Sequence, residues 1–456
     1  MNKIVVKFGG SNLKDEQGIT WITQRVKEYN SPLIIVVSAF FGITNFLTDG
    51  IEKVLQNSEE IQAILSRIRN KKHKTIDYFI QENEDNLKVK ALLDIRLGEL
   101  EKFLKGINYI GDIPDFISDK VLSYGERLSS LLLTQILQSM GIEAQEALPE
   151  DIGFYTDGEH GNATIDFEIS TPLVRESLKE DKVYIIPGFY GMSQSNKVTL
   201  LGRGGSDYSA AGLAKMMGAP SLDIWKDVSG YRTADPKIVP SSLGIAELSY
   251  QEAAELSYFG AKILHPRTVE PLLETSIPIR IFNIEEEGLS PKSQITDHRI
   301  INDRVIKSVT YSNDFAILRL EGPGVGVKHG ILADVTGLLN DNKINIKSVV
   351  TSQTVINIYL ESGDLDQALE ILGKLKNSAI TKITGEDKQT LVAVVGHGIK
   401  DKPGIAMTMI AALSDQNINI KNIALGASDV ASYLVIDNED KINAVKAIHE
   451  AFFTQR

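Results

Sequence analysis

The chain has 456 residues, of which 43% are hydrophobic, so it can bury sizeable cores in about two to four domains. Its 48 lysines and arginines against 60 aspartates and glutamates give a net charge of -12, which argues against nucleic acid and anionic membranes as partners. The chain contains 0 cysteines, which excludes thiolate nucleophiles, disulfides and cysteine-ligated zinc or iron–sulfur centres.

Two further absences bear on the compartment. No apolar run approaches the ~20 residues that a membrane-spanning helix requires. The amino terminus enters a predicted strand at once, and no signal peptide is visible. We therefore expect a cytoplasmic protein without a membrane partner.

The first predicted element is a buried strand at residues 4–6, because β-branched runs favour the pleated conformation. It leads into Lys7-Phe8-Gly9-Gly10-Ser11, where two glycines allow the backbone N–H groups to approach a ligand and Lys7 supplies an ammonium group. This pattern predicts an anion site. It matches neither the G-x-x-x-x-G-K-[ST] loop nor G-x-G-x-x-G, and an ordinary strand-to-loop turn is the alternative.

Residues 1–50 have a β-α-β pattern whose second strand is expected at 33–37. Continuous apolar strands separated by helices predict a mostly parallel sheet covered on both faces. Residues 51–106 are charged and almost free of glycine and proline, which predicts a helical insertion on the surface. One long helix is expected from Ser118 to Met140, with the glycine that follows just past its end.

A second glycine-rich turn, residues 202–207, follows the strand expected at 198–201 and precedes a helix expected at 208–217. Its glycines would present N–H groups at a helix start, and the guanidinium of Arg203 can grip a carboxylate with two hydrogen bonds. A glycine-rich turn with a solvated arginine is the alternative. Further along the chain, Ser249 and Glu252 have the spacing of a helix capping box.

Three other segments carry candidate chemistry. A strand delivers Asp227 into a loop with a proline that could wrap a base and ribose, and Lys262 lies near a helix start where it could meet phosphates. The pair Glu126 and Arg127 lies inside the long predicted helix. By itself, such a pair is typical of a solvated helix face.

The last third of the chain contains an internal repeat, in which residues 329–347 align with residues 403–421 without a gap. Each copy has a glycine turn, an amphipathic helix and a strand, and further strands are expected before and after it. Two β-α-β-β modules of ferredoxin-like type are therefore expected, since two copies are too few for a solenoid.

These segments together resemble the aspartate kinase family of the amino-acid kinase fold, in the order in which that family carries them. The matching segments are KFGGS at 7–11, VSAFFGITN at 37–45, SYGERLS at 123–129, LLGRGGSDYSAA at 200–211, WKDVSGYRTADPK at 225–237 and YFGAKILHP at 258–266. The C-terminal repeats resemble the paired ACT domains of the same enzymes, VVGHGIKDKPGIA at 394–406 being especially characteristic.

The resemblance implies an α/β fold with a three-layer α/β/α sandwich and a mostly parallel sheet, followed by two ferredoxin-like βαββαβ ACT domains. We expect the catalytic domain at residues 1–295, with its helical insertion at about 51–106, and the ACT domains at 305–380 and 388–456. Members of the family often thread the second ACT module into the first, and the sequence leaves this open.

The implied reaction is transfer of the γ-phosphoryl group of ATP to the side-chain carboxylate of L-aspartate, giving 4-phospho-L-aspartate, the first step of lysine, threonine and methionine biosynthesis. A carboxylate with a pKa near ~4 is already ionised at neutral pH, so no general base is needed. The reaction does need charge neutralisation and alignment of two anions. Mg2+ would bridge the phosphate oxygens, and no metal site made of protein ligands is expected.

The same resemblance implies roles for single residues. Lys7, Asp207 and Lys262 would be catalytic, with Asp207 holding Lys7 in position. The α-amino and α-carboxylate groups of aspartate would meet Glu126 and Arg203, and Ser38 and Thr44 would hydrogen-bond the substrate. The residues expected to contact ATP are Lys7, Gly9, Gly10, Gly204, Gly205, Ser206, Lys226, Asp227, Arg232, Lys237 and Lys262.

Some positions depart from the family pattern. Lys237 follows Pro236 where the family commonly has arginine, and Arg232 stands where an aromatic or aliphatic residue is frequent. Lysine-sensing members tend to carry acidic residues around the positions of Lys347 and Gln353.

Feedback regulation by lysine, threonine or both is implied, with the effector bound at the paired ACT modules; which amino acid it is stays open. The residues expected to bind it are Gly330, Ile331, Asn345, Ile346, Thr351, Ser352 and Gln353. A homodimer or homotetramer assembled through ACT sheet edges is expected. No appended homoserine dehydrogenase is expected, since the chain ends soon after the second module.

Two alternatives remain. One is a kinase of the same fold that acts on glutamate, carbamate or a nucleoside monophosphate, which the ACT repeat and the GRGGSD turn disfavour. The other is an amino-acid sensor with a degenerate kinase-like domain and no activity. The intact set of charged residues argues against it: Lys7, Glu126, Arg203, Asp207 and Lys262.

Overall fold

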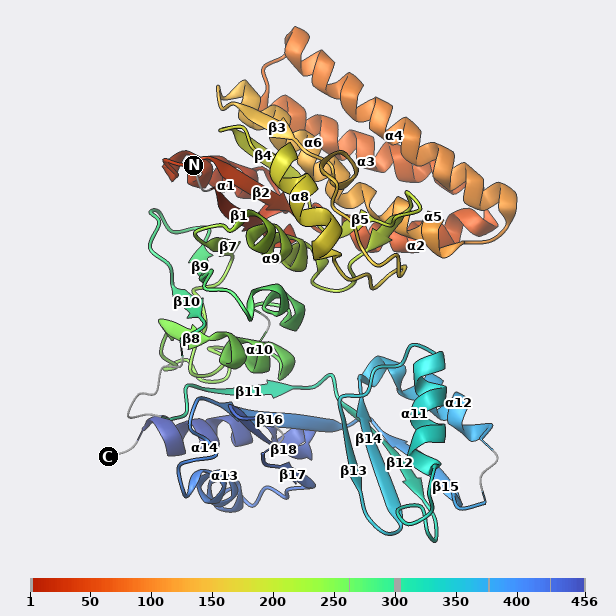
Figure 1. Ribbon diagram of the computed structural model, residues 1–456, viewed down its shortest axis with the longest axis vertical. Helices are drawn as coiled ribbons and strands as arrows, with labels where there is room; N and C mark the ends of the chain where they lie inside the picture. The colour runs from red at the N-terminus through yellow and green to blue at the C-terminus, as the bar shows by residue number, and fades with distance from the viewer. Residues whose placement is uncertain (1–2, 262, 299–304, 376–377, 427, 455–456) are drawn as a thin grey trace. The chain divides into compact units, whose positions relative to one another are not determined.

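A computed structural model describes residues 3–261, 263–298, 305–375, 378–426 and 428–454 (Figure 1). The chain divides into two compact units. The first unit comprises residues 1–231, 244–257 and 262–300, and the second comprises residues 232–243, 258–261 and 301–456. Two short segments that the sequence analysis assigned to the catalytic domain therefore belong to the second unit.

The described part of the first unit is built on an eight-stranded sheet in the order β3-β4-β2-β1-β7-β9-β10-β8. Neighbouring strands are parallel except β9 and β10. The predicted mostly parallel sheet is thus confirmed, and its central strands are buried because helices cover both faces. The strands are β1 (Ile4–Phe8), β2 (Leu33–Val37), β3 (Ala144–Glu146), β4 (Val183–Pro187), β7 (Leu222–Lys226), β8 (Glu247–Ser249), β9 (Ile279–Asn283) and β10 (Ser293–Thr296).

Helices form the two outer layers. α9 packs against β1, β2 and β7, and α8 packs against α9. The expected helical region falls in α2, α3 and α4, which pack on one another, as the long α3 and α4 show in Figure 1. The helices are α1 (Glu16–Glu28), α2 (Ile43–Gln56), α3 (Glu59–Phe79), α4 (Glu84–Ile110), α5 (Asp115–Leu122), α6 (Tyr124–Ser139), α7 (Pro149–Ile152), α8 (Phe167–Ser177), α9 (Gly205–Met217) and α10 (Tyr250–Tyr258). Among the described residues, no helix is both long and apolar enough to cross a membrane.

The single long helix predicted at 118–140 is wrong, because the structure has two helices, α5 and α6, that meet at Ser123. The Ser123 hydroxyl donates to the Lys120 carbonyl at 2.7 Å. It thereby competes with the backbone for a helical acceptor. The capping box is confirmed: the Glu252 N–H donates to Ser249 Oγ at 3.1 Å, and the Ser249 N–H donates to Glu252 Oε2 at 2.9 Å.

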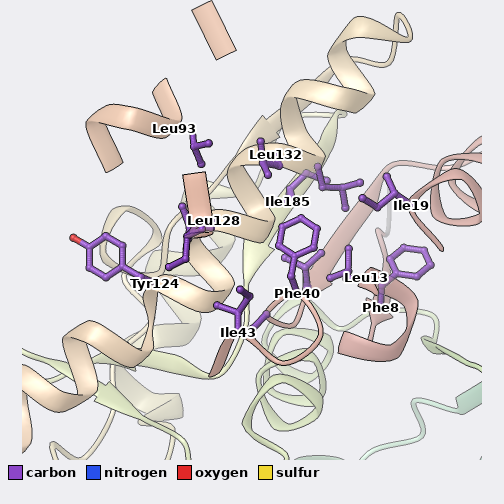
Figure 2. Packing of buried hydrophobic residues seen from close by; sticks show 14 of the residues in the cluster. Phe8, Leu13, Ile19, Phe40, Ile43, Leu93, Tyr124, Leu128, Leu132 and Ile185 are labelled. Atoms are coloured by element: carbon purple, nitrogen blue, oxygen red, sulfur yellow. The ribbon is translucent and has the colours of Figure 1, made fainter. Parts of the chain in front are cut away.

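One buried hydrophobic cluster joins the sheet to the helices on one of its faces. It includes Phe8 of β1, Ile185 of β4, Ile19 of α1, Leu93 of α4 and Leu128 of α6 (Figure 2). This packing fixes the strand β1 and the helix α6 relative to each other. Short pieces complete the unit: the antiparallel pair β5 (Tyr190–Met192) and β6 (Val198–Leu200), and the 3-10 helices η1 (Gly10–Leu13), η2 (Pro266–Thr268) and η3 (Glu270–Leu272).

The second unit contains two four-stranded sheets among its described residues, in the orders β13-β14-β12-β15 and β11-β16-β18-β17. The first sheet belongs to a continuous βαββαβ module, as predicted. Its elements are β12 (Ala316–Glu321), α11 (Ile331–Asp341), β13 (Ser348–Thr351), β14 (Val355–Leu360), η4 (Ser362–Asp364), α12 (Leu365–Gly373) and β15 (Lys382–Glu386).

In the second module the fourth strand comes from before the first module. β11 pairs antiparallel with β16 and takes the edge position beside it. The first module is therefore inserted into the second, whereas the sequence analysis considered the second threaded into the first. The first module was expected to begin at residue 305, but β11 lies outside it. The elements are β11 (Ser308–Ser312), β16 (Gln389–Val395), α13 (Ile405–Ser414), β17 (Asn422–Ala424), β18 (Ala431–Asp437), η5 (Asn438–Asp440) and α14 (Lys441–Phe453).

The segment 232–243 extends the core of this second module. Ala234, Ile238 and Val239 are part of its buried cluster. The Val309 N–H donates to the Thr233 carbonyl at 2.8 Å, and the Thr233 hydroxyl lies 2.9 Å from His449 Nε2 in α14.

A buried ion pair joins two strands of the first unit. Asp223 of β7 is fully buried and accepts hydrogen bonds of 2.7 and 2.6 Å from Arg280 of β9. The Tyr29 hydroxyl donates to Asp223 at 2.8 Å, and Trp225 Nε1 donates to that hydroxyl at 3.1 Å. Removing the Asp223 carboxylate would leave both the Arg280 guanidinium and the Tyr29 hydroxyl without their shared acceptor.

We expect Asp223→Ala to lower the free energy of unfolding of the first unit by about 2–4 kcal/mol, because the half-buried Arg280 guanidinium and the buried Tyr29 hydroxyl lose their acceptor. Urea titration followed by tryptophan fluorescence measures this, since Trp21 and Trp225 both lie in the first unit. Glu176→Ala is the control: it removes an exposed partner of Lys179 and should leave the midpoint unchanged. Equal shifts in the two variants would contradict a special role for the buried pair.

Candidate active site

The carboxyl ends of the central parallel strands meet at one edge of the sheet, where α/β proteins bind ligands. β1, β2, β4 and β7 run in the same direction, so the loops after them leave from the same edge. Three motifs lie in these loops, with Gly9 after β1, Ser38 after β2 and Asp227 after β7. The first turn of α9 reaches the same edge, since a Cβ atom added to Gly188 after β4 would lie 2.9 Å from Ser206.

A carboxylate shared by two lysines lies at the centre of this edge. Lys7 of β1 is buried and forms an ion pair with Asp207 of α9, and Lys226 of β7 donates to the other Asp207 oxygen at 3.3 Å. Burial favours the neutral acid, but the two ammonium groups outweigh it and lower the pKa of Asp207 to about 2. Burial also lowers the pKa of Lys7, against the attraction of Asp207. The predicted contact between Lys7 and Asp207 is present, and Lys226 is an additional partner.

A second carboxylate has the opposite character. Glu126 of α6 is buried, and its Oε1 accepts a hydrogen bond from the Ala39 N–H at 2.9 Å. Its Oε2 lies outside hydrogen-bond geometry with every described donor. Burial raises the pKa of Glu126 to about 8, although Ala39, Lys7 and Ser206 favour the charged form. A buried acceptor of this kind is suited to a cationic group of a ligand.

Close backbone packing holds Glu126 beside the loop after β2. A Cβ atom added to Gly125 would lie 2.8 Å from the Ala39 side chain and 3.6 Å from Thr44 Oγ1. Thr44 is half-buried in the first turn of α2, and the Ser38 N–H donates to the Phe8 carbonyl at 3.2 Å. The structure therefore brings Ser38 after β2, Thr44 of α2 and Glu126 of α6, the predicted substrate residues, to the same edge of the sheet.

Two of the glycine N–H groups expected to face phosphates already have partners in the chain. The Gly9 N–H donates to Asn12 Oδ1 at 3.0 Å, and the Gly205 N–H donates to the Gly202 carbonyl at 3.0 Å. These bonds close the two turns, and contact of Gly9 and Gly205 with ATP stays a prediction. At Gly10 the backbone passes close to the loop after β2, since a Cβ atom there would lie 3.1 Å from the Ala39 carbonyl oxygen.

The other residues predicted to contact ATP do not all lie in the first unit. Asp227 is exposed and accepts a hydrogen bond from the Ser11 hydroxyl at 3.3 Å. Arg232 and Lys237 lie in the second unit, where Arg232 Nε donates to Ser242 Oγ at 3.0 Å and Lys237 is exposed. Lys262 lies outside the described residues.

Arg203 and Gly204 lie in the turn before α9. The Arg203 side chain is exposed, and Gly204 has φ of 71°, in the left-handed region that favours glycine. A Cβ atom at Gly204 would lie 2.3 Å from the His265 side chain. Burial lowers the pKa of His265 below its ordinary value.

Three residues that contribute to this edge were not predicted from the sequence. They are Ala39 through its N–H, Asn12 through its side chain, and Arg267, which donates hydrogen bonds beside the turn before α9. Asn12 had a weak local signal, because asparagine after a glycine turn often bonds the backbone. Ala39 and Arg267 had none, since they act through contacts with residues distant in the sequence. Among the described residues, no group of three or more histidine, aspartate or glutamate side chains could hold a metal ion.

The expected effector residues lie at one end of the first module in the second unit. Gly330 begins α11 with φ of 90°, and Ile331 is buried. The preceding loop meets the turn after β13, where the Gly326 N–H donates to the Gln353 carbonyl at 3.1 Å. Thr351 is exposed at the end of β13, Ser352 and Gln353 are exposed in that turn, and Asn345 and Ile346 lie just before β13.

Comparison with solved structures gives full-length similarity. Escherichia coli aspartokinase III in complex with aspartate and ADP is 27% identical with a TM-score of 0.84, covering 99% of this chain and 100% of that chain. The same protein in complex with lysine and aspartate is 27% identical with a TM-score of 0.80, covering 99% of each chain.

Among curated proteins, the bifunctional aspartokinase/homoserine dehydrogenase of Haemophilus influenzae is 30% identical over 99% of this chain and 57% of its own length. Aspartokinase 2, chloroplastic, of Arabidopsis thaliana is 29% identical over 98% of this chain and 84% of its own length. The chain spans about half the length of the bifunctional relatives that it matches.

Family comparison assigns both parts of the chain. Residues 392–452 match an ACT domain, which agrees with the second ferredoxin-like module. Residues 2–283 match the amino acid kinase family, and this match covers more than half of the chain and every strand that borders the charged edge. The chain therefore belongs to the amino acid kinase family.

Proposed function

We propose that this chain is an aspartate kinase, which transfers the γ-phosphoryl group of ATP to the side-chain carboxylate of L-aspartate. The observation that carries the proposal is one sheet edge with two buried carboxylates: Glu126, whose Oε2 has no hydrogen-bond partner among the described residues, and the lysine-bound Asp207. Glu126 suits the α-amino group of an amino acid, and the lysines suit phosphates. The similarity to E. coli aspartokinase III, solved with aspartate and ADP, supports the same pairing of ligands.

The chemistry asks the protein for charge neutralisation rather than proton transfer. The acceptor carboxylate is already ionised, and both reactants are anions that repel each other. Lys7 and Lys226 place two ammonium groups at this edge, and Asp207 holds both of them where they could meet phosphate oxygens. Because its pKa is lowered to about 2, Asp207 stays ionised and acts as the anchor of the two ammonium groups.

The residues present fit a nucleotide bound with Mg2+. Lys7 and Lys226 would hold phosphate oxygens, and the ion would neutralise further phosphate charge when bound. Mg2+ keeps several waters and is usually held by substrate phosphates with one or two carboxylates.

Hydroxylamine trapping tests the proposed reaction directly, because an acyl phosphate reacts with hydroxylamine to give a hydroxamate. The purified protein with ATP, Mg2+ and L-aspartate should form aspartyl hydroxamate. L-Glutamate in place of aspartate should give none. Glutamyl hydroxamate would indicate the related kinase activity, and the absence of any product would reject a catalytic role.

We expect Lys7→Met to lower kcat by at least about a hundredfold, since a preorganised charge at a transferring phosphoryl group is commonly worth that much. Lys88→Met, on the exposed surface of α4, is the matched control and should retain the parental rate. Circular dichroism would show that both variants are folded. Parental turnover by a folded Lys7→Met variant would reject the role of this ammonium.

The raised pKa of Glu126 predicts a pH dependence of aspartate binding. At pH 7 a carboxyl with a pKa of about 8 is mostly protonated, whereas an ammonium group requires the ionised form. Binding must therefore release a proton, so KM for aspartate should fall as pH rises from about 6 to about 8, by up to tenfold per unit.

Glu126→Gln should raise KM for aspartate at pH 8 by at least about tenfold and abolish this slope, because the amide cannot ionise. Initial rates at saturating ATP across the pH range measure both effects. Glu176→Gln, which changes an exposed residue of α8, should keep the parental slope. A Glu126→Gln variant with an unchanged slope would assign the pH dependence to another group.

We further propose that the first ACT module binds an amino-acid effector near α11. E. coli aspartokinase III has been solved with lysine, which supports an effector of this chemical class. Lys347 of this chain donates to the Asp314 carbonyl at 2.7 Å and lies 3.8 Å from Glu361, so its charge is held at the start of β13. Inhibition assays with lysine, threonine, methionine and their pairs would identify the effector.

Gly326→Ala should raise the effector concentration needed for half-inhibition. Its Cβ atom would lie 1.9 Å from the Ser352 carbonyl oxygen, so the loop before α11 must move away from the turn after β13. Gly337→Ala in α11 is the control, since its Cβ atom would meet nothing within 4 Å. Inhibition curves that coincide for the two variants would place the effector elsewhere.

A further inference from the structure

Arg267 holds together three segments around the turn that carries Arg203. It lies in η2, directly after Pro266, and its side chain is mostly buried. Nη1 donates to the Leu201 carbonyl at 2.8 Å and to Asn162 Oδ1 at 3.0 Å, and Nη2 donates to the Ala163 carbonyl at 3.0 Å.

The guanidinium also covers the first turn of α9. Its central carbon lies 4.3 Å from the centre of the Tyr208 ring, within the range of a cation–π contact. Tyr208 follows Asp207, the shared partner of the two lysines. One side chain thus touches both ends of the segment from Leu201 to Tyr208.

That segment has little regular structure to hold it before α9 begins. Gly202 and Gly204 both have positive φ, of 74° and 71°, and the segment leaves β6 immediately before them. A Cβ atom at Gly202 would lie 2.8 Å from Asn162 Oδ1, so the loop around Asn162 is packed tightly against the turn. Arg267 bonds the Asn162 side chain and the Leu201 carbonyl from the same nitrogen, and so links the two packed segments.

The other side of the turn rests on the same short helix. His265, two residues before Arg267, packs against Gly204, and the Arg267 N–H donates to His265 Nδ1 at 3.4 Å. Two contacts flank Arg203 in the chain. On one side, Arg267 donates to the Leu201 carbonyl, and on the other, His265 packs against Gly204. The position of the Arg203 backbone therefore depends on η2 and on the residue just before it.

We propose that Arg267 is a positioning residue for aspartate recognition, which sets the Gly202–Gly204 turn so that Arg203 can meet the α-carboxylate of the substrate. The inference rests on the proposed aspartate kinase activity and adds a residue to its aspartate side. Only a planar guanidinium can reach Leu201, Asn162 and Ala163 at once, whereas an ammonium group lacks the fork geometry.

The test compares Michaelis constants for the two substrates. Arg267→Lys, which keeps the charge and loses the fork, should raise KM for aspartate by about tenfold or more, while KM for ATP changes by less than about twofold. Asn162→Ala removes one of the three acceptors without touching Arg267, and should raise KM for aspartate by about threefold. Glu270→Gln, which alters only an exposed residue 3.9 Å from Arg267 Nε, should change neither constant.

Thermal unfolding of each variant separates positioning from stability. An increase in KM for aspartate at an unchanged unfolding midpoint supports the proposal. Unchanged KM for aspartate in both Arg267→Lys and Asn162→Ala, or equal increases in both Michaelis constants, would overturn it. The proposed function itself fails on a different result, namely that the parental protein forms no aspartyl hydroxamate.

Discussion

The shared carboxylate of Asp207 is the contact on which the charged edge of the sheet depends. It joins β1, β7 and α9 through Lys7 and Lys226, and it keeps two ammonium groups close together in a buried place. Without it the two ammonium groups would repel each other, and burial would favour the neutral form of Lys7. With it, a chain of net charge -12 retains a local positive site for an anionic ligand.

The two carboxylates of this edge show how surroundings set their states. Both Asp207 and Glu126 are buried, yet the pKa of the first is lowered and that of the second is raised. The difference comes from their partners, since Asp207 is bound by two ammonium groups, while Glu126 accepts the Ala39 N–H and its Oε2 has no hydrogen-bond partner in the described part of the chain. Such divergent pairs are characteristic of functional sites, because each group is prepared for a different ligand charge.

In the second unit, one module is inserted into the other. β11 completes the sheet of the second module, so the whole first module is an insertion between β11 and β16. The segment 232–243 adds apolar side chains to the same core and bonds β11 and α14. The stretch that carries Arg232 and Lys237 is therefore stabilised by the second module.

Local features were readable from the sequence alone: the strands of the parallel sheet, the Ser249–Glu252 capping box, the glycine turns and the internal repeat. Each depends on residues a few positions apart, where backbone preference and side-chain period act directly. Only the tertiary structure established that Lys226 shares Asp207, that Asn12 occupies the Gly9 N–H, that β11 joins the later sheet and that Arg267 ties the Arg203 turn. These contacts join residues that are mostly far apart in the chain, and the competition between alternative partners is resolved by packing, which no local pattern records.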